Sequence, residues 1–222
     1  GAEASATVSI NILAENDTPI VTAAIPDQST DEDAVFTYTI PANTFNDADG
    51  DSLSLNATLA DGSALPAWLN FDSATSTFAG TPANENVGEL EIRVTADDGN
   101  GGSVEDVFLL NIANTNDAPL ANDDANTTLE DTPIVLNVAD LLANDNDADG
   151  DELTISSVGN AVGGLAVLDA LEGTVTFSPA DGYNGVASFD YIVVDGSGAE
   201  ASATVSINIL AENDTPIVTA AI

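Results

Sequence analysis

The 222-residue sequence contains no cysteine, no histidine and no lysine, and its single basic residue is Arg93. These absences exclude disulfides, zinc sites of the usual ligand set and every His-dependent catalytic triad. A formal charge of −37 excludes nucleic acid as a partner and disfavours an anionic membrane surface, because no cations are available to neutralise phosphate. No apolar run approaches the length of a transmembrane helix, so we expect no membrane span in this segment. Carboxylates are therefore the main functional groups that this sequence offers for binding or catalysis. Acidic surfaces also keep proteins soluble in salty water, which is an alternative reason for the charge.

One acidic loop, Asn-Asp-Ala-Asp-Gly-Asp, occurs at 46–51 and again at 146–151. Each copy holds three carboxylates within five residues, around a glycine that permits a sharp turn. Two unpaired charges about 4 Å apart repel by roughly 4 kcal/mol at an effective dielectric constant of about 20. A folded loop must therefore splay these groups into water or bind a cation, and hard oxygen ligands suit calcium. The alternative is a solvated Asp-Gly turn. An EF-hand fits poorly, because the twelfth position counted from Asp145 is Ser156 rather than Glu.

The sequence also repeats on a larger scale. Residues 1–25 are identical to residues 198–222, an offset of 197 residues, so we interpret the chain as a window from a tandem array of identical repeats. The motif Asn-Asp-x-Pro occurs at 16–19, 116–119 and 213–216, and its proline makes each copy a short, stiff linker. We predict the last strand and linker of a preceding repeat at 1–17, modules at 18–117 and 118–214, and the start of the next repeat at 215–222.

Short runs with strand periodicity recur through both modules, and no long stretch has a helical period. The sequence therefore predicts an all-β protein made of two Ig-like or cadherin-like Greek-key β-sandwiches in tandem. In the first module we expect strands at Val35–Ile40, Leu53–Leu59, Thr77–Ala79, Glu89–Ala96 and Val104–Ile112. In the second we expect strands at Ile134–Val138, Leu153–Ser157, Ala166–Leu168, Thr174–Phe177, Ser188–Val194 and Ala203–Leu210, with a short helical turn within Ala139–Ala143.

Residues 1–14 also alternate, with Val8, Ile10 and Ile12 on one face, which predicts a half-buried strand. The second copy of this stretch closes the second module as its last strand. The first copy has no module before it, so it should be frayed or should pair with the sheet edge of another chain. Homotypic lateral contacts, strand pairing and filament formation through this segment therefore stay open.

Acidic positions of four kinds recur in both modules. They are the linker Asn-Asp, the acidic loop, an Asp before the last strand (Asp98 and Asp195) and an early Glu (Glu32 and Glu130). In a Greek-key sandwich, the loops before the third and last strands lie at the end that meets the incoming linker. The early Glu lies at the opposite end. We therefore expect loops from one module and the early Glu of the module before it to converge on each linker.

These motifs resemble those of bacterial cadherin-like repeats. Residues 25–118 resemble the dystroglycan-type cadherin-like module through Ile25-Pro-Asp-Gln28, Asp47-Ala-Asp-Gly-Asp51, Pro66-Ala-Trp-Leu69, Phe78-Ala-Gly-Thr-Pro82 and Val94-Thr-Ala-Asp-Asp-Gly99. Residues 121–216 resemble the tandem cadherin-like module of giant surface adhesins through Glu130-Asp-Thr-Pro133, Leu142-Ala-Asn-Asp145, Asp147-Ala-Asp-Gly-Asp151, Phe177-Ser-Pro179, Phe189-Asp-Tyr191 and Asp195-Gly196. The resemblance implies Ca²⁺ at domain junctions, an extended rod and an extracellular place at a bacterial cell surface. The cadherin Asp-Arg-Glu ligand motif is absent, so one side of each site has fewer ligands.

The resemblance also implies a set of calcium ligands. The first junction would use Asn16, Asp17, Asp47, Asp49, Asp51 and Asp98. The middle junction would use Glu32, Asn116, Asp117, Asp147, Asp149, Asp151 and Asp195. A third set comprises Glu130, Asn213 and Asp214.

Three classes of function compete for this sequence. The first is a calcium-stiffened structural extender, or stalk segment, of a repetitive bacterial surface adhesin or extracellular fibre. The second is a carbohydrate- or ligand-binding adhesion module, which needs exposed aromatic residues, but we expect Trp68 to fill the core. The third is an enzyme such as a glycoside hydrolase, which we do not expect, because the carboxylates fall in turns and no catalytic residues stand out.

Overall fold

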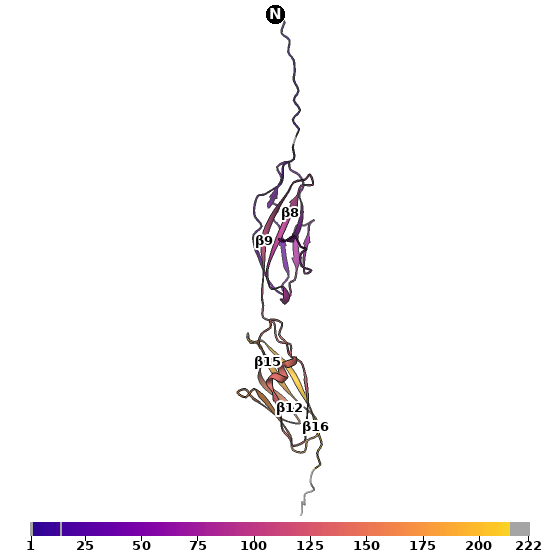
Figure 1. Cartoon of the computed structure of the whole chain (residues 1–222), viewed down its shortest axis with the longest axis vertical. Coiled ribbons are helices and arrows are strands. Elements are labelled where there is room, and N and C mark those ends of the chain that lie inside the picture. Colours follow the sequence, from indigo (N-terminus) through magenta and orange to yellow (C-terminus); the bar gives the residue numbers. More distant parts are fainter. Residues whose placement is uncertain (1, 14, 214–222) are drawn as a thin grey trace, which may run out of the picture. The chain divides into compact units, whose positions relative to one another are not determined.

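The computed structural model describes residues 2–13 and 15–213. It divides into two compact units between Thr115 and Asn116. We call residues 15–115 the N-terminal module and residues 116–213 the C-terminal module. Each module is an all-β sandwich of a four-stranded and a three-stranded sheet (Figure 1).

The four-stranded sheet of the N-terminal module has the order β2-β9-β8-β5, and the three-stranded sheet has the order β3-β7-β6. β2 runs parallel to β9, whereas β8 pairs antiparallel with both β5 and β9. A further short pair joins β1 to β4. The strands are β1 (Ile20–Val21), β2 (Gln28–Asp31), β3 (Phe36–Thr39), β4 (Phe45–Asn46), β5 (Ser54–Leu59), β6 (Leu69–Asp72), β7 (Thr77–Gly80), β8 (Gly88–Asp97) and β9 (Ser103–Ala113), with a 3₁₀ turn η1 at Asn84–Asn86.

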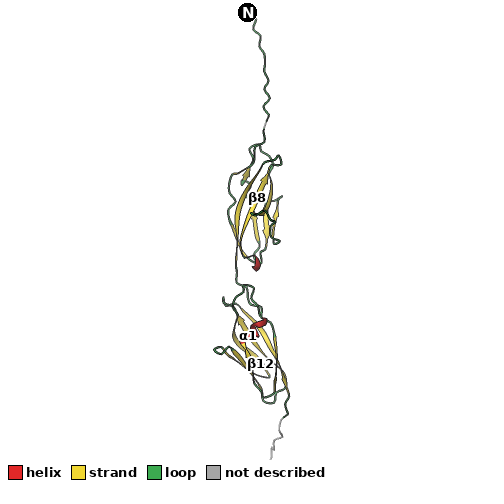
Figure 2. Cartoon of the chain, in the orientation of Figure 1, coloured by secondary structure: helices red, strands yellow, loops and turns green. Residues whose placement is uncertain are grey.

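The C-terminal module repeats this plan, with sheets β10-β16-β15-β12 and β11-β14-β13 (Figure 2). β10 runs parallel to the last strand β16, and a single bridge between Leu120 and Asn146 stands where β1 pairs with β4 in the first module. The elements are β10 (Asp124–Leu129), β11 (Ile134–Asn137), α1 (Val138–Leu141), η2 (Leu142–Asn144), β12 (Thr154–Val162), β13 (Gly164–Asp169), β14 (Thr174–Pro179), β15 (Gly185–Val194) and β16 (Glu200–Leu210).

Each core lies between the two sheets and is built from the alternate residues of the long strands. In β8, the inward-facing Ile92, Val94 and Ala96 are completely buried. Aromatic rings fill the centre, with Phe78 and Phe108 5.6 Å apart edge to face. Trp68 is half-buried and packs against this cluster, as expected from the sequence.

The long strands and the short helical turn agree with the predicted ranges to within a few residues, except that β12 extends five residues beyond its predicted end, from Ser157 to Val162. The sequence reading missed the edge strands β2 and β10. Neither has a fully buried residue, because each lies at the margin of its sheet and pairs on one side only. A polar edge strand has no hydrophobic alternation, so the periodicity of the sequence does not predict it. β1, β4 and β6 were also missed, and they have four residues or fewer.

The predicted strand at the start of the chain does not form in the single chain. Residues 2–13 have no secondary structure, and Val8, Ile10 and Ile12 are each more than 80% exposed. The described part of this segment is therefore unpaired, as expected for the frayed alternative, and pairing with the sheet edge of another chain stays a prediction. Residues 1, 14 and 214–222 lie outside the described residues.

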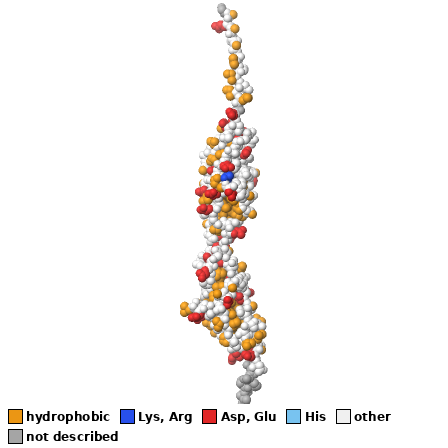
Figure 3. Space-filling model, in the orientation of Figure 1, with side chains coloured by type: hydrophobic (Ala, Val, Ile, Leu, Met, Phe, Trp, Pro, Cys, Tyr) orange, Lys and Arg blue, Asp and Glu red, His pale blue; other side chains and the backbone are white. Residues whose placement is uncertain are grey.

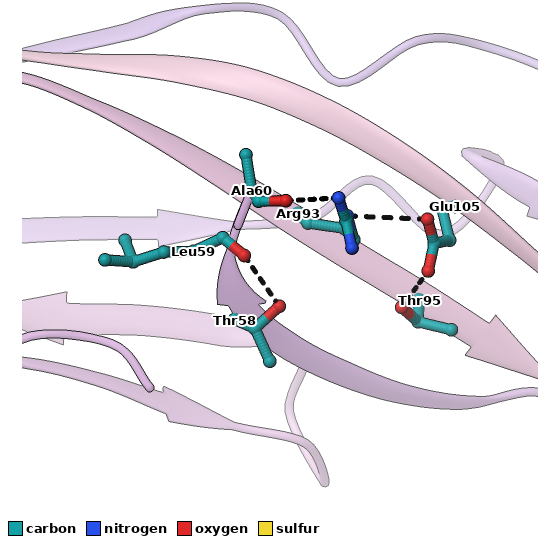
Figure 4. Close-up of polar contacts among 6 residues, drawn as sticks. All are labelled: Thr58, Leu59, Ala60, Arg93, Thr95 and Glu105. Atoms are coloured by element: carbon teal, nitrogen blue, oxygen red, sulfur yellow. Dashed lines mark hydrogen bonds and ion pairs between the residues drawn. The ribbon is translucent and has the colours of Figure 1, made fainter. Parts of the chain in front are cut away.

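The single cation of the sequence lies on the outer face of the N-terminal module. Arg93, on β8, donates to the carbonyl of Ala60, and its Nε lies 3.4 Å from a Glu105 carboxylate oxygen on β9 (Figure 4). Elsewhere, red acidic groups recur over both modules and blue is nearly absent from the face shown in Figure 3. Among the described residues, no helix is long and apolar enough to cross a membrane.

Candidate metal centre

The acidic loop of the N-terminal module, residues 47–51, follows β4 and is closed on itself by Asp47. This side chain is buried, and its Oδ1 accepts hydrogen bonds from the backbone N–H groups of Asp49 (2.9 Å) and Asp51 (3.3 Å). Gly50 has φ = 81°, a conformation that glycine adopts without steric cost. The turn brings carboxylate oxygens of all three aspartates within 4.8 Å of one another.

The incoming linker is attached to this loop. Asp49 Oδ2 accepts from the backbone N–H of Asp17 at 2.7 Å, and Glu15, Asn16, Asp49 and Asp51 line a shallow hollow. Asp98, in the loop before β9, completes the arrangement. Its Oδ2 accepts from the Asn16 side-chain amide at 3.0 Å, while its Oδ1 accepts from the N–H groups of Asn100 and Gly102.

The C-terminal module repeats the loop-closing and linker hydrogen bonds at the matching positions. Asp147 is buried and accepts from the N–H groups of Asp149 (2.9 Å) and Asp151 (3.3 Å). Asp149 Oδ2 accepts from the linker N–H of Asp117 at 2.7 Å, and Asp195 Oδ2 accepts from the Asn116 amide at 2.8 Å. Two modules of different sequence thus hold their linker residues in one way.

The early glutamates lie at the other end of each module. Glu32 follows β2, and its Oε1 accepts from the N–H of Thr115, beyond the end of β9. Glu130 follows β10; its Oε1 accepts from the N–H of Glu212, and its Oε2 accepts from the Asn184 amide at 3.3 Å. Because Asp98 precedes the eleven-residue strand β9 and Thr115 follows it, the two ends are separated by roughly 35 Å of extended chain.

Each module leaves a buried carboxylate oxygen without a protein partner. Asp47 Oδ2, Asp147 Oδ2 and Glu32 Oε2 are inaccessible to solvent and accept no hydrogen bond. A buried charge in this state is costly unless it is paired or coordinates a metal. At Asp47 the orphaned oxygen belongs to a group of three aspartates whose carboxylate oxygens lie within 4.8 Å of one another. This is the donor set that a hard cation such as Ca²⁺ requires, so the residues present there fit that ion.

The charge states of the surrounding carboxylates suit a cation as well. The Asn16 side-chain amide lowers the pKa of Asp98, and the Asn116 amide lowers the pKa of Asp195, so both groups are held ionised. Burial raises the pKa of Asp151, and the charges of Asp147, Asp149 and Asp195 raise it further. The repulsion among these four groups is what a bound cation would relieve.

Hydrogen bonds thus join the incoming linker to the acidic loop and to the Asp before the last strand in each module, whereas Glu32 and Glu130 lie at the other end of their modules. A few contributors were not predicted from the sequence. Asn100 donates to Asp51 Oδ2 at 2.8 Å, and Asn184 donates to Glu130. Asn100 directly follows the Asp98-Gly99 turn, and this position beside a predicted ligand could have predicted its role. Asn184 has no motif around it in the sequence. Asn213 is the last described residue, and Asp214 lies outside the described range.

Comparison with known families and structures agrees with this architecture. Residues 115–210 match the family described as "Cadherin-like domain", and residues 18–113 match the family described as "Putative Ig domain". No match was found among curated protein sequences.

Among solved structures, the chain resembles domains EC1-2 of human mucin-like protocadherin, with 18% identity and a TM-score of 0.51 over 87% of this chain and 98% of that one. It resembles domains EC1-4 of Drosophila N-cadherin with 15% identity and a TM-score of 0.51, over 87% and 50% of the two chains. The first match, an endo-fucoidan hydrolase of glycoside hydrolase family 107, has 19% identity and a TM-score of 0.39 over 88% of this chain, and the chain spans only 29% of its length. The chain thus consists of two tandem β-sandwich domains of the immunoglobulin-like and cadherin-like families.

Proposed function

We propose that the chain is a calcium-stiffened extender segment of a repetitive extracellular adhesin or fibre, in which Ca²⁺ fixes each linker to the module that follows it. Tandem cadherin-like domains fit an extracellular adhesion or extender module. A bacterial cell surface is part of the proposal, and the motif resemblance supports it. The observation that carries it is the orphaned, buried Oδ2 of Asp47 and of Asp147, at one position in two modules of different sequence.

The residues that would hold the ion in the C-terminal module are Asp147, Asp149, Asp151 and Asp195, together with the linker residues Asn116 and Asp117. Asp47, Asp49, Asp51, Asp98, Asn16 and Asp17 would do so in the N-terminal module. Calcium would supply positive charge where four carboxylates repel one another. Glu32 and Glu130, with Asn213 and Asp214, belong to the proposal as the ligands at the outgoing ends.

The proposed stiffness of the linker depends on the hydrogen bonds that its residues make with the two modules. Thr115 is bonded to Glu32 of the N-terminal module, and the next two residues, Asn116 and Asp117, are bonded to Asp195 and Asp149 of the C-terminal module. No residue between the two sets of hydrogen bonds is unattached. A cation that holds the carboxylates in place therefore also holds the linker.

Neither alternative function has comparable support. A carbohydrate-binding module needs aromatic rings on its surface, and Trp68 packs against the core. An enzyme needs carboxylates in a sheltered cleft, whereas these lie in loops beside a shallow hollow.

Thermal unfolding with and without calcium tests the proposal. Extracellular calcium modules have dissociation constants of about 10⁻⁴ to 10⁻³ M. At a calcium concentration of about 100 times the dissociation constant, binding stabilises the folded state by about 2.7 kcal/mol. For modules of this size the melting temperature should rise by roughly 10 °C or more. Equal melting temperatures in calcium and in chelator, with no heat of binding in a calorimetric titration, would contradict it.

A further inference from the structure

Two asparagines that donate hydrogen bonds to acidic groups share a further feature. Asn100 donates to Asp51 Oδ2 at 2.8 Å, and Asn184 donates to Glu130 Oε2 at 3.3 Å. Each is followed directly by glycine, and these are the two Asn-Gly steps of the sequence. The chemistry of an Asn-Gly step acts on the same side-chain amide that makes the hydrogen bond.

Asparagine is one of the labile side chains of proteins, and the reaction that consumes it involves the backbone of the next residue. The backbone nitrogen of that residue attacks the side-chain Cγ, a C–N bond forms, and the Cγ–Nδ2 bond breaks with release of ammonia. Water then opens the five-membered imide at either carbonyl, which yields aspartate or isoaspartate. In sum, one amide and one water become a carboxylate and an ammonium ion. Glycine favours the ring closure because it has no Cβ atom to obstruct the close approach.

The surroundings of Asn100 and Gly101 leave room for this reaction. Both residues are exposed, and they lie in the loop between β8 and β9, outside regular secondary structure. Gly101 has φ = 108°, and a Cβ atom built on it would meet no atom within 4 Å beyond its chain neighbours. The backbone nitrogen and the water that opens the ring therefore both have access to the side chain of Asn100.

The second step is more restrained. Asn184 and Gly185 are also exposed, but Gly185 is the first residue of β15 and is paired with Ile209 of β16. Ring closure requires the backbone to rotate, and the pairing with β16 opposes that rotation. We therefore expect Asn184 to react more slowly than Asn100.

We propose that Asn100–Gly101 and Asn184–Gly185 are self-modification sites, at which the chain converts an amide donor into a carboxylate beside an existing acidic group. Each conversion adds one negative charge to a chain whose formal charge is already −37. At Asn100 it removes the donor that lies 2.8 Å from Asp51 Oδ2 and puts a like charge in its place. Water is the one co-reactant.

The consequence for the candidate metal centre rests on the proposed function. Asp51 is one of the three aspartates whose carboxylate oxygens lie within 4.8 Å of one another. Without a cation, a further carboxylate at position 100 adds repulsion to this group. With Ca²⁺ bound, the same carboxylate supplies another charged oxygen ligand. Conversion should therefore destabilise the N-terminal module in chelator and make its stability depend more strongly on calcium.

Ageing of the full chain in chelator at mildly alkaline pH tests the modification. Asn160 is the internal control, because it is exposed and donates to Asp190 Oδ2 at 2.8 Å but is followed by alanine. Mass spectrometry of the peptides should show Asn100 converted first and Asn184 second, with Asn160 still an amide when half of Asn100 is lost. An isoaspartate-specific carboxyl methyltransferase should label position 100, since direct hydrolysis of the amide gives aspartate alone.

Two variants provide the second arm. Asn100→Gln keeps an amide but cannot close a five-membered ring, so ageing should leave that position unchanged. Asn100→Asp reproduces the product in the fresh chain, and its melting temperature in chelator should lie below those of Asn100→Gln and of the unsubstituted chain. In calcium this difference should shrink.

Each part of the proposal has an outcome that would overturn it. Equal conversion of Asn100 and Asn160, or aspartate at position 100 without isoaspartate, would overturn the modification. A fresh Asn100→Asp chain that melts in chelator at the temperature of the unsubstituted chain would overturn its effect on Asp51. Conversion of Asn100 with a difference in melting temperature that calcium does not reduce would support the modification and contradict the proposed calcium function.

Discussion

At the scale of single residues, Asp147 has two separate roles in the candidate metal centre of its module. One oxygen of its carboxylate closes the loop through two backbone N–H groups, and the other is buried without a partner. The first role belongs to the fold, and we propose that the second is to bind the cation. An asparagine at this position keeps the first role, because its side-chain oxygen accepts the same bonds, and removes the charge.

Asp147→Asn should therefore separate the two roles. In chelator the C-terminal module should become more stable, because a buried charge beside three other carboxylates is removed. In calcium the module should lose most of its metal-dependent rise in melting temperature. Differential scanning calorimetry in both buffers measures the two changes.

Asp169→Asn is the matched control, since Asp169 closes an exposed turn in the same module with both contributing bonds on Oδ1. It should leave the calcium response unchanged. An equal loss of the calcium response in both variants would contradict the role given to Asp147.

Asp124 offers a test by pH. Burial raises the pKa of its carboxyl group, the Tyr191 hydroxyl that donates to it at 3.1 Å opposes the rise, and the charges of Asp145 and Asp123 add to it. A raised pKa in the folded state means that the contribution of Asp124 to stability is greatest below its ordinary pKa of 3.8 and is lost as the pH rises through the folded-state value. Asp124→Asn should raise the melting temperature of the module at pH 7, and the gain should vanish near pH 3. Since Asn still accepts from Tyr191, a loss of stability at pH 7 would show that the assignment is wrong.

At the scale of elements, the strands divide into those that hydrophobic alternation reveals and those that it does not. The central strands have ten or eleven residues and alternate buried with more exposed side chains, so hydrophobic alternation in the sequence predicts them. They are β8, β9, β15 and β16. β2 and β10 bury no side chain fully, and each pairs on one side only, with the last strand of its module. β12 extends beyond its predicted end, through two register shifts. Only Ile155 in this strand is fully buried, so the sequence of the extension has no hydrophobic alternation that would predict it.

The acid positions were predictable for a different reason. The order of elements in a Greek-key sandwich puts the loop before β5 and the loop before β9 beside the incoming linker, and hydrogen bonds from Asp17 and Asn16 join the linker to these two loops. Asn184 was out of reach, because it lies in a loop that only the folded module brings next to Glu130.

The close approach of β7 to the Trp68 segment gives an element-scale prediction. A Cβ atom on Gly80 would lie 2.0 Å from the carbonyl oxygen of Trp68, a backbone atom that cannot turn aside. Gly80→Ala should destabilise the N-terminal module by about 3 kcal/mol, as overpacking does. Gly159→Ala, where the added Cβ meets no atom within 4 Å, should change stability by less than about 1 kcal/mol. Urea unfolding curves of the two variants measure the difference, and equal midpoints would contradict the packing argument.

At the scale of the whole molecule, the formal charge of −37 bears on how the tandem modules are linked. A chain with one basic residue has almost no internal means to neutralise its carboxylates, and the most concentrated groups of them lie where a linker meets a module. In the function proposed above, a divalent cation would supply the missing charge at those places. The mechanical behaviour of the chain should then follow the calcium concentration rather than the strength of contacts between surfaces.

The most direct measurement of this claim is ¹⁵N relaxation of the full chain in calcium and in chelator. With calcium bound, the amides of both modules should report one common rotational correlation time, because residues 115–117 are fixed at both ends. In chelator the two modules should report separate and shorter correlation times, and Asp147→Asn should behave in calcium as the unsubstituted chain does in chelator. Correlation times for the two modules that do not change with calcium would contradict the proposal that the ion stiffens the chain.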